Sequence, residues 1–317
     1  MADERGYHAS FNCLWCGRPH QTRSDTDLEG FAVLCPDCVG RAQDNEFLRY
    51  LLRQGLSRRA AAQGEIVAEA ATAAADVLPS PAAVDPVALP PSDEAAATLR
   101  DYYAARAPEY DDWYLRRGRY NHGTLADVAW QADLDTATLW LDAVPLSGEI
   151  VELAAGTGWW SPLLAQKGEL SIYDAVEEPL DRARDRLLAH GLRAHIHVRD
   201  AWAEPDRQVD GLFCGFWLSH VPRARLAEFL ALCRRWIKPG GTFAFIDSRR
   251  DPASGAADHP APADDLSARR LDDGREFVIV KVYYEPAELE QALIEAGFVT
   301  AEVTTTPRFF LLGRAAG

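Results

Sequence analysis

The chain has 317 residues, of which 48% are hydrophobic, and its formal net charge of −15 gives a pI near 5.0. This apolar content is enough for one sizeable core and a small satellite domain. The acidic balance disfavours binding to nucleic acid or to an anionic membrane surface. The first residues form no apolar signal segment and no apolar run approaches a membrane span, so we expect a cytoplasmic protein with reduced thiols.

Four of the six cysteines lie near the N-terminus in two pairs, Cys13 with Cys16 and Cys35 with Cys38. Four thiolates at this spacing can surround one Zn²⁺ and fold a segment that is too short for its own core. The segment resembles a zinc ribbon, and we expect structural Zn²⁺, because four thiolates leave no open coordination position. Disulfides or redox-active pairs are the alternative.

Composition divides the rest of the chain into further parts. A helix is predicted for residues 43–59, where leucines recur at helical spacing. Residues 60–97 are dominated by alanine and contain five prolines, which is typical of an extended linker. The sequence therefore predicts a zinc ribbon with its following helix in 1–59, an Ala/Pro-rich linker in 60–97, and a larger domain in 98–317.

The larger domain begins with two predicted helices, one starting at Ser92 and rich in aromatic residues, and one over about 124–141. Strands and helices then alternate, which indicates an α/β fold with a mostly parallel sheet and helices on both faces. The predicted strands cover 150–152, 170–174, 194–198, 209–216 and 242–246, and the predicted helices cover 159–166, 180–190 and 223–237.

The C-terminal part departs from this alternation. Residues 248–274 are polar and predict a loop or lid, followed by a strand over 276–284 and a helix over 286–296. Two more strands are predicted over 298–304 and 308–312. Because a hairpin joins them, we expect one antiparallel strand near the C-terminus of the sheet.

The most informative motif follows the first predicted strand of the sheet. Glu152 comes directly before a turn that contains Gly156 and Gly158, and a helix follows. A glycine turn between strand and helix lets the backbone approach a nucleotide-like ligand. A carboxylate there would repel a pyrophosphate but suit a cation, which points to S-adenosylmethionine (SAM). A nicotinamide-dependent dehydrogenase is the competing enzyme, but Ser161 and Pro162 stand where its fingerprint needs a third glycine.

Several motifs together resemble the class I SAM-dependent methyltransferases, and most of all the small-molecule type related to the quinone C-methyltransferases. They are the Glu152–Gly158 turn, Asp174, Asp200, the segment Phe216–His220, Lys238-Pro-Gly-Gly241 and the closing hairpin. The resemblance covers about 99–314 and implies a Rossmann-like sheet. One departure is Ala154, where the family usually has a glycine.

The resemblance implies a role for each matching residue. Glu152 and the backbone from Ala154 through Gly156 to Gly158 would hold the methionine end of SAM, and Asp174 would accept both ribose hydroxyls. Asp200 would accept from the adenine amino group beside Ala201 and Trp202, and the Phe216 carbonyl would face the ligand ammonium. The product would be S-adenosylhomocysteine (SAH).

Aromatic side chains near the strand ends are candidates for the remaining walls of the site. Tyr103 and Tyr110 are expected beside the cofactor, where aromatic faces stabilise a sulfonium. Trp217, His220, Tyr283 and Tyr284 are expected to line the substrate pocket, and packing in the core is the alternative for each.

His220 is the candidate general base, because it follows a strand end and imidazole titrates near neutrality. Capping of the next helix is the alternative role, and His122 is a second candidate base. Asp111 is expected to face solvent.

The sequence thus predicts a SAM-dependent methyltransferase that acts on a small organic molecule. One alternative is an RNA or protein methyltransferase in which the ribbon recognises the substrate; a basic cluster at Arg49, Arg53, Arg58 and Arg59 is its only support. The other is a non-catalytic SAM-binding scaffold whose ribbon docks a protein partner.

Overall fold

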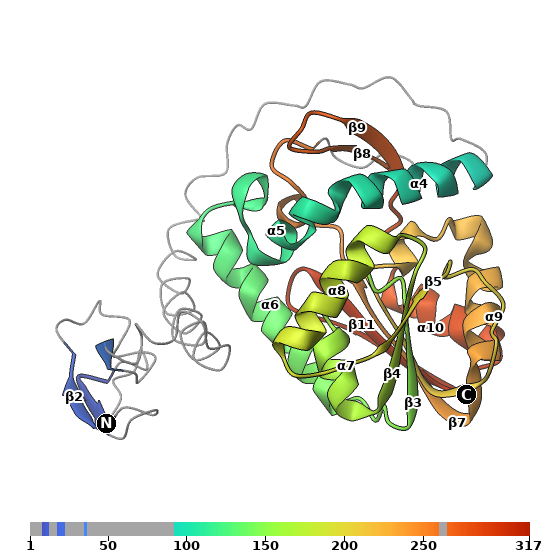
Figure 1. Cartoon of the computed structure of the whole chain (residues 1–317), viewed down its shortest axis with the longest axis horizontal. Helices are drawn as coiled ribbons and strands as arrows, with labels where there is room; N and C mark the ends of the chain where they lie inside the picture. The colour runs from blue at the N-terminus through green and yellow to red at the C-terminus, as the bar shows by residue number, and fades with distance from the viewer. Residues whose placement is uncertain (1–7, 13–17, 23–34, 37–91, 260–264) are drawn as a thin grey trace. The chain divides into compact units, whose positions relative to one another are not determined.

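The computed structural model describes residues 8–12, 18–22, 35–36, 92–259 and 265–317 (Figure 1). The chain divides into two compact units, one of residues 1–86 with 123–132 and one of residues 87–122 with 133–317. In the first unit, β1 (Ser10–Asn12) pairs antiparallel with β2 (Pro19–Gln21). Within the described ranges, no helix has the length and apolarity needed to cross a membrane.

A seven-stranded sheet with the order β10-β11-β7-β6-β3-β4-β5 forms the centre of the second unit. Its strands are β3 (Glu149–Leu153), β4 (Glu169–Asp174), β5 (His195–Val198), β6 (Val209–Gly215), β7 (Ile237–Ser248), β10 (Thr300–Thr305) and β11 (Phe310–Ala316). β11 is antiparallel to both of its neighbours, and every other pair is parallel. The prediction of a mostly parallel sheet with one antiparallel strand is confirmed.

Helices cover both faces of this sheet, as predicted. They are α7 (Ser161–Lys167), α8 (Glu177–Ala189), α9 (Leu226–Trp236) and α10 (Pro286–Glu295), while α6 (Thr124–Ala143) precedes the sheet in the sequence. Right-handed crossovers place α7 and α8 on the face opposite α9 and α10 (Figure 1). Phe229 and Leu230 of α9 pack with Phe243 and Phe245 of β7 in the main core.

β7 begins earlier than the sequence predicted. Its pairing with β6 jumps from Val209–Ile237 to Gly211–Thr242, so the segment from Lys238 to Gly241 forms an irregular bulge inside one long strand. The helix therefore ends at Trp236, before the Pro-Gly-Gly sequence that was expected to stop it, and Pro-Gly-Gly instead interrupts a strand that has already begun.

A layer of four elements lies above the carboxyl ends of the parallel strands (Figure 1). It consists of α4 (Ser92–Arg106), α5 (Tyr110–Leu115), β8 (Leu266–Arg270) and β9 (Glu276–Val280), and we name it the lid layer. Tyr102 and Leu99 of α4 pack with Ile279 of β9 and with Leu271. The lid layer thus closes the strand ends from above.

The prediction of a loop over 248–274 was wrong in part, because β8 lies inside it and pairs antiparallel with β9. β8 has the sequence Leu-Ser-Ala-Arg-Arg, so its buried positions are occupied by Leu266 and Ser267 rather than by alternating apolar residues. β8 forms because it pairs with β9, and a search for alternating hydrophobic residues cannot detect such a strand.

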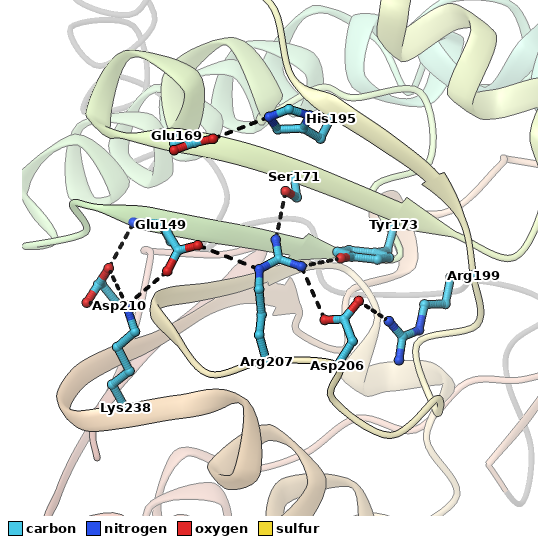
Figure 2. Close-up of polar contacts among 10 residues, drawn as sticks. All are labelled: Glu149, Glu169, Ser171, Tyr173, His195, Arg199, Asp206, Arg207, Asp210 and Lys238. Carbon is cyan, nitrogen blue, oxygen red and sulfur yellow. Dashed lines mark hydrogen bonds and ion pairs between the residues drawn. The ribbon is translucent and has the colours of Figure 1, made fainter.

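A network of ion pairs lies mainly around the amino ends of the strands and reaches along β4 to Tyr173 and to Arg199 after β5; we name it the amino-edge cluster (Figure 2). Arg207 donates to the Ser171 Oγ and the Tyr173 Oη, each at 2.9 Å, and also pairs with Asp206. Lys238 Nζ lies 3.0 Å from a carboxylate oxygen of Glu149 and 3.1 Å from one of Asp210; Arg199 pairs with Asp206, and His195 with Glu169. Each of its lysine and arginine side chains thus faces a carboxylate.

Candidate active site

Two adjoining cavities lie between the lid layer and the carboxyl ends of the strands. The first, the strand-end cavity, is lined by residues that follow β3, β4 and β6 and by α4. The second, the cationic cavity, has a volume of about 280 Å³ and is lined mainly by α4, the segment after β7 and the segment around β9. Four residues line both: Tyr103, Tyr110, Phe216 and His220. The cavities therefore meet at these four side chains.

The strand-end cavity lies where the strand order reverses, between β3 and β6. This is the position where open α/β sheets bind ligands. The structure brings most of the predicted cofactor residues together there. They are Tyr103, Tyr110, Ala154, Gly156, Asp174, Asp200, Ala201, Trp202 and Phe216.

The loop after β3 is left-handed at three positions. Ala154, Gly156 and Gly158 have φ values of 51°, 54° and 70°. A Cβ on Gly158 would lie 2.7 Å from the Cβ of Ala183 in α8, so only glycine fits there. Ala154 takes a left-handed conformation, which is strained for alanine but not for glycine. Alanine in place of the family's glycine therefore costs more here than it would in the extended backbone of a strand end, where the sequence placed it.

Glu152 lies beneath this loop rather than in the wall of either cavity. It is 1% exposed and accepts a hydrogen bond from the Ser161 Oγ at 2.5 Å. Burial raises the pKa of Glu152 to about 8, with a smaller contribution from the negative charge of Asp174. The sequence therefore placed the acid correctly at the end of β3, but the structure gives it contact with the base of α7 instead of a cavity.

Asp174 connects the ends of two strands at the wall of the strand-end cavity. Its carboxylate accepts hydrogen bonds from the backbone N–H groups of Gly156, at 2.9 Å, and Val176, at 3.0 Å. Burial raises the pKa of Asp174 to about 6, against the lowering effect of these hydrogen bonds. The side chain is thus mainly ionised at neutral pH and fixes the glycine loop.

Asp200 stands across the same cavity. Its Oδ1 accepts from the backbone N–H of Trp202 at 2.9 Å, and its Oδ2 lies 3.3 Å from the guanidinium of Arg100 on α4. The two acids therefore converge on one cavity from the ends of β4 and β5, as the sequence predicted for residues at neighbouring strand tips.

His220 is held between the two cavities by both ring nitrogens. Nδ1 lies 2.7 Å from the carbonyl oxygen of Val280, and Nε2 lies 2.7 Å from the hydroxyl of Tyr103. A carbonyl only accepts, so Nδ1 carries the proton and Nε2 accepts from Tyr103. Burial, together with repulsion from Lys281, holds the pKa of His220 well below its usual value. The expectation that it titrates near neutrality was wrong.

The other residues predicted for the substrate pocket and for the base do not all line the same cavity. Tyr283 lines only the cationic cavity, and Trp217 lines only the strand-end cavity. Tyr284 lines neither, because its hydroxyl donates to the carbonyl of Val221 inside the core. His122, the second candidate base, contacts the Gly255 carbonyl and also lines neither cavity.

The predicted zinc ligands fall mostly outside the described residues. Cys13, Cys16 and Cys38 are not among them, and Cys35 is buried. In the ranges that the structure describes, no group of three or more potential ligands could hold a metal ion. The β1–β2 pairing brackets the Cys13–Cys16 segment in sequence.

Sequence reasoning missed two groups of side chains near the site. Arg106, Arg250, Arg269 and Lys281 all line the cationic cavity, although they come from distant segments. Asp111 does not face solvent as predicted, since it pairs with Arg186 and accepts from the Thr157 Oγ1 at 2.7 Å. It thereby ties α5 to the glycine loop.

Comparisons with known proteins agree with this geometry. A family model described as "Methyltransferase domain" matches residues 150–241. The structure of DhpI in complex with SAH is 31% identical and has a TM-score of 0.56, and the match covers 71% of this chain and 97% of that one. A complex of DhpI with SAM and HEP matches equally well. The chain belongs to the class I SAM-dependent methyltransferases.

Two curated relatives share shorter segments with this methyltransferase. The ubiquinone/menaquinone biosynthesis C-methyltransferase UbiE of Azotobacter vinelandii is 30% identical over 35% of this chain and 46% of its own length. Dimethylglycine N-methyltransferase of Parasynechococcus marenigrum is 34% identical over 39% of this chain and 44% of its own. The chain thus spans less than half the length of these relatives.

Proposed function

We propose that this methyltransferase transfers the methyl group of SAM to a small organic acceptor, with SAM in the strand-end cavity and the acceptor in the cationic cavity. The meeting of the two cavities at Tyr103, Tyr110, Phe216 and His220 carries this proposal. Direct transfer of a methyl group needs the donor and the acceptor to occupy adjoining sites that open into each other. The residues around the junction must also keep water out.

The residues of the strand-end cavity fit SAM. Asp174 has an ionised carboxylate for a vicinal diol, and the Ala154–Gly158 loop exposes backbone to the ligand. Asp200 and the backbone at Ala201 and Trp202 would hold the adenine. When bound, SAM supplies an electrophilic methyl group on a sulfonium.

Tyr103 and His220 form the proposed proton-accepting pair. The neutral imidazole accepts from the Tyr103 hydroxyl, and burial raises the pKa of Tyr103, so that the phenol stays protonated. An acceptor that loses a proton would pass it to the Tyr103 oxygen while His220 takes the phenolic proton. His220 remains the proposed base, and its low pKa keeps Nε2 unprotonated at neutral pH.

The N-terminal part is proposed to be a zinc ribbon, with Cys13, Cys16, Cys35 and Cys38 as ligands of structural Zn²⁺. The cysteine spacing supports this, as does a hairpin whose strands flank the first pair. The division into ribbon (1–59), linker (60–97) and methyltransferase domain (98–317) and the cytoplasmic location are parts of the same proposal.

The test is turnover by the full chain. Purified protein is incubated with SAM and a panel of small organic acceptors, and the release of SAH is measured. We expect release that depends on one acceptor and falls at least tenfold in Asp174→Ala. If no small acceptor supports release while RNA or a protein does, the small-molecule proposal fails.

A further inference from the structure

The walls of the cationic cavity carry more positive than negative charge. Arg106, Arg250, Arg269 and Lys281 line it, and among the described lining residues the one carboxylate is that of Asp251. Asp251 is already paired with Arg308, which lies outside the cavity wall, through contacts of 2.7 and 3.1 Å. Asp251 therefore pairs with neither Arg106 nor Lys281.

Arg106 is a buried cation without a carboxylate partner among the described residues. Arg106 is 8% exposed, and its Nε makes no hydrogen bond to the described residues. The guanidinium instead lies over the rings of Tyr102, Tyr110 and Tyr120, at 4.6 to 5.7 Å from the ring centres. Buried charges are usually paired, so an arginine in this state calls for an anion from outside the protein.

Lys281 is the second buried cation, at 7% exposure. It donates to Ser219 Oγ at 2.7 Å and Ser248 Oγ at 3.2 Å, while its nearest carboxylate oxygen, on Asp247, lies 3.9 Å away. Burial lowers the pKa of Lys281 to about 8, with further lowering by Arg269 and Arg106. The Asp247 carboxylate is thus too distant to offset burial and the neighbouring cations.

Three of the cationic side chains lower the pKa of the same residue, His220. Lys281, Arg269 and Arg106 each repel a proton from His220, which lies at the junction of the two cavities. Burial keeps the hydroxyls of Tyr103 and Tyr110 protonated, because it raises the pKa of both, so no phenolate balances the charge. All three cations therefore act on a residue that lies where the acceptor would meet the methyl donor.

From this geometry we propose that the methyl acceptor is a small anion whose carboxylate or phosphoryl group is bound by Arg106 and Lys281. Guanidinium and ammonium groups together suit a compact oxyanion, since the guanidinium offers paired N–H donors. The net charge of −15 does not favour a polyanion, and a cavity of about 280 Å³ suits a small molecule. This inference rests on the proposed function and names its substrate class.

The test measures anion binding without turnover. The full chain is saturated with SAH and titrated by calorimetry with inorganic phosphate, with acetate, and with the neutral isostere acetamide. We expect one of the two anions to bind at one site per chain, at least tenfold more tightly than acetamide. Preference for phosphate or for acetate distinguishes a phosphoryl acceptor from a carboxylate acceptor.

One variant in the cavity and one control variant outside it locate the site. Arg106→Met should weaken anion binding at least tenfold with SAH affinity kept, whereas Arg207→Met in the amino-edge cluster should leave anion affinity unchanged. Lys281→Met replaces Arg106→Met if the latter does not fold. If SAH binds but neither anion does, or if Arg207→Met weakens the anion as much, the inference is overturned. Failure of SAH itself to bind would count against the proposed function instead.

Discussion

The amino-edge cluster and the cationic cavity lie toward opposite ends of the same parallel strands. They differ in whether their cationic side chains are paired with carboxylates. In the cluster, Arg207 and Lys238 each contact a carboxylate within hydrogen-bond reach (Figure 2). In the cavity, Arg106 is more deeply buried and has no acid at that range among the described residues. Paired charge at the surface supports a fold at modest gain, while unpaired buried charge costs stability and is kept for a ligand.

The largest expected difference comes from the same substitution made at both ends. Lys281→Met should lower kcat/KM for an anionic acceptor roughly tenfold to a hundredfold, because a charge-assisted hydrogen bond to the ligand is lost. Lys238→Met should leave kcat/KM unchanged. Steady-state assays of SAH release compare the two, and equal losses would remove the distinction between the regions.

His220→Ala tests the residue that the cavity cations surround. Turnover should fall roughly a hundredfold with SAH affinity kept, if the imidazole accepts a proton through Tyr103. Because the pKa of His220 is lowered, the wild-type rate should decline only at acid pH, and the variant should lack that decline. A variant with the same pH–rate profile as the wild type would exclude His220 as the base.

The pH dependence of anion binding sharpens the contrast further. The pKa of Lys281 is lowered to about 8 by burial, and of the charged groups that face it, Asp247 raises it while Arg269 and Arg106 lower it. The charged form is lost as pH rises through that value, so anion affinity should be constant below about pH 7 and fall above pH 8. Calorimetric titrations from pH 6 to pH 9 measure this, and Lys281→Met should abolish the fall.

The smallest expected effect concerns the Ala154–Gly158 loop, where the substitution removes no charged group. Ala154→Gly should stabilise the fold by about 1 kcal/mol or less, because relief of left-handed strain is offset by greater freedom of the unfolded chain. Denaturant unfolding measures the difference. A loss of stability would show that the alanine methyl group contributes packing that outweighs the strain.

The sequence predicted the sheet, its single antiparallel strand and the acids Asp174 and Asp200, because each of these depends on a local pattern at a strand end. It missed the cationic cavity, since Arg106 and Lys281 are 175 positions apart and meet only through the lid layer. It also did not reveal how deeply Glu152 and His220 are buried, and the expectation that His220 titrates near neutrality was wrong. Their positions along the chain were correct, but burial decides where each side chain points and how it titrates.

Calorimetric titration of the full chain with SAH, and separately with NADH, tests the whole account most directly. Binding of SAH at one site, lost in Asp174→Ala and kept in Arg207→Met, is the predicted result. Tight binding of NADH with no heat from SAH would contradict it.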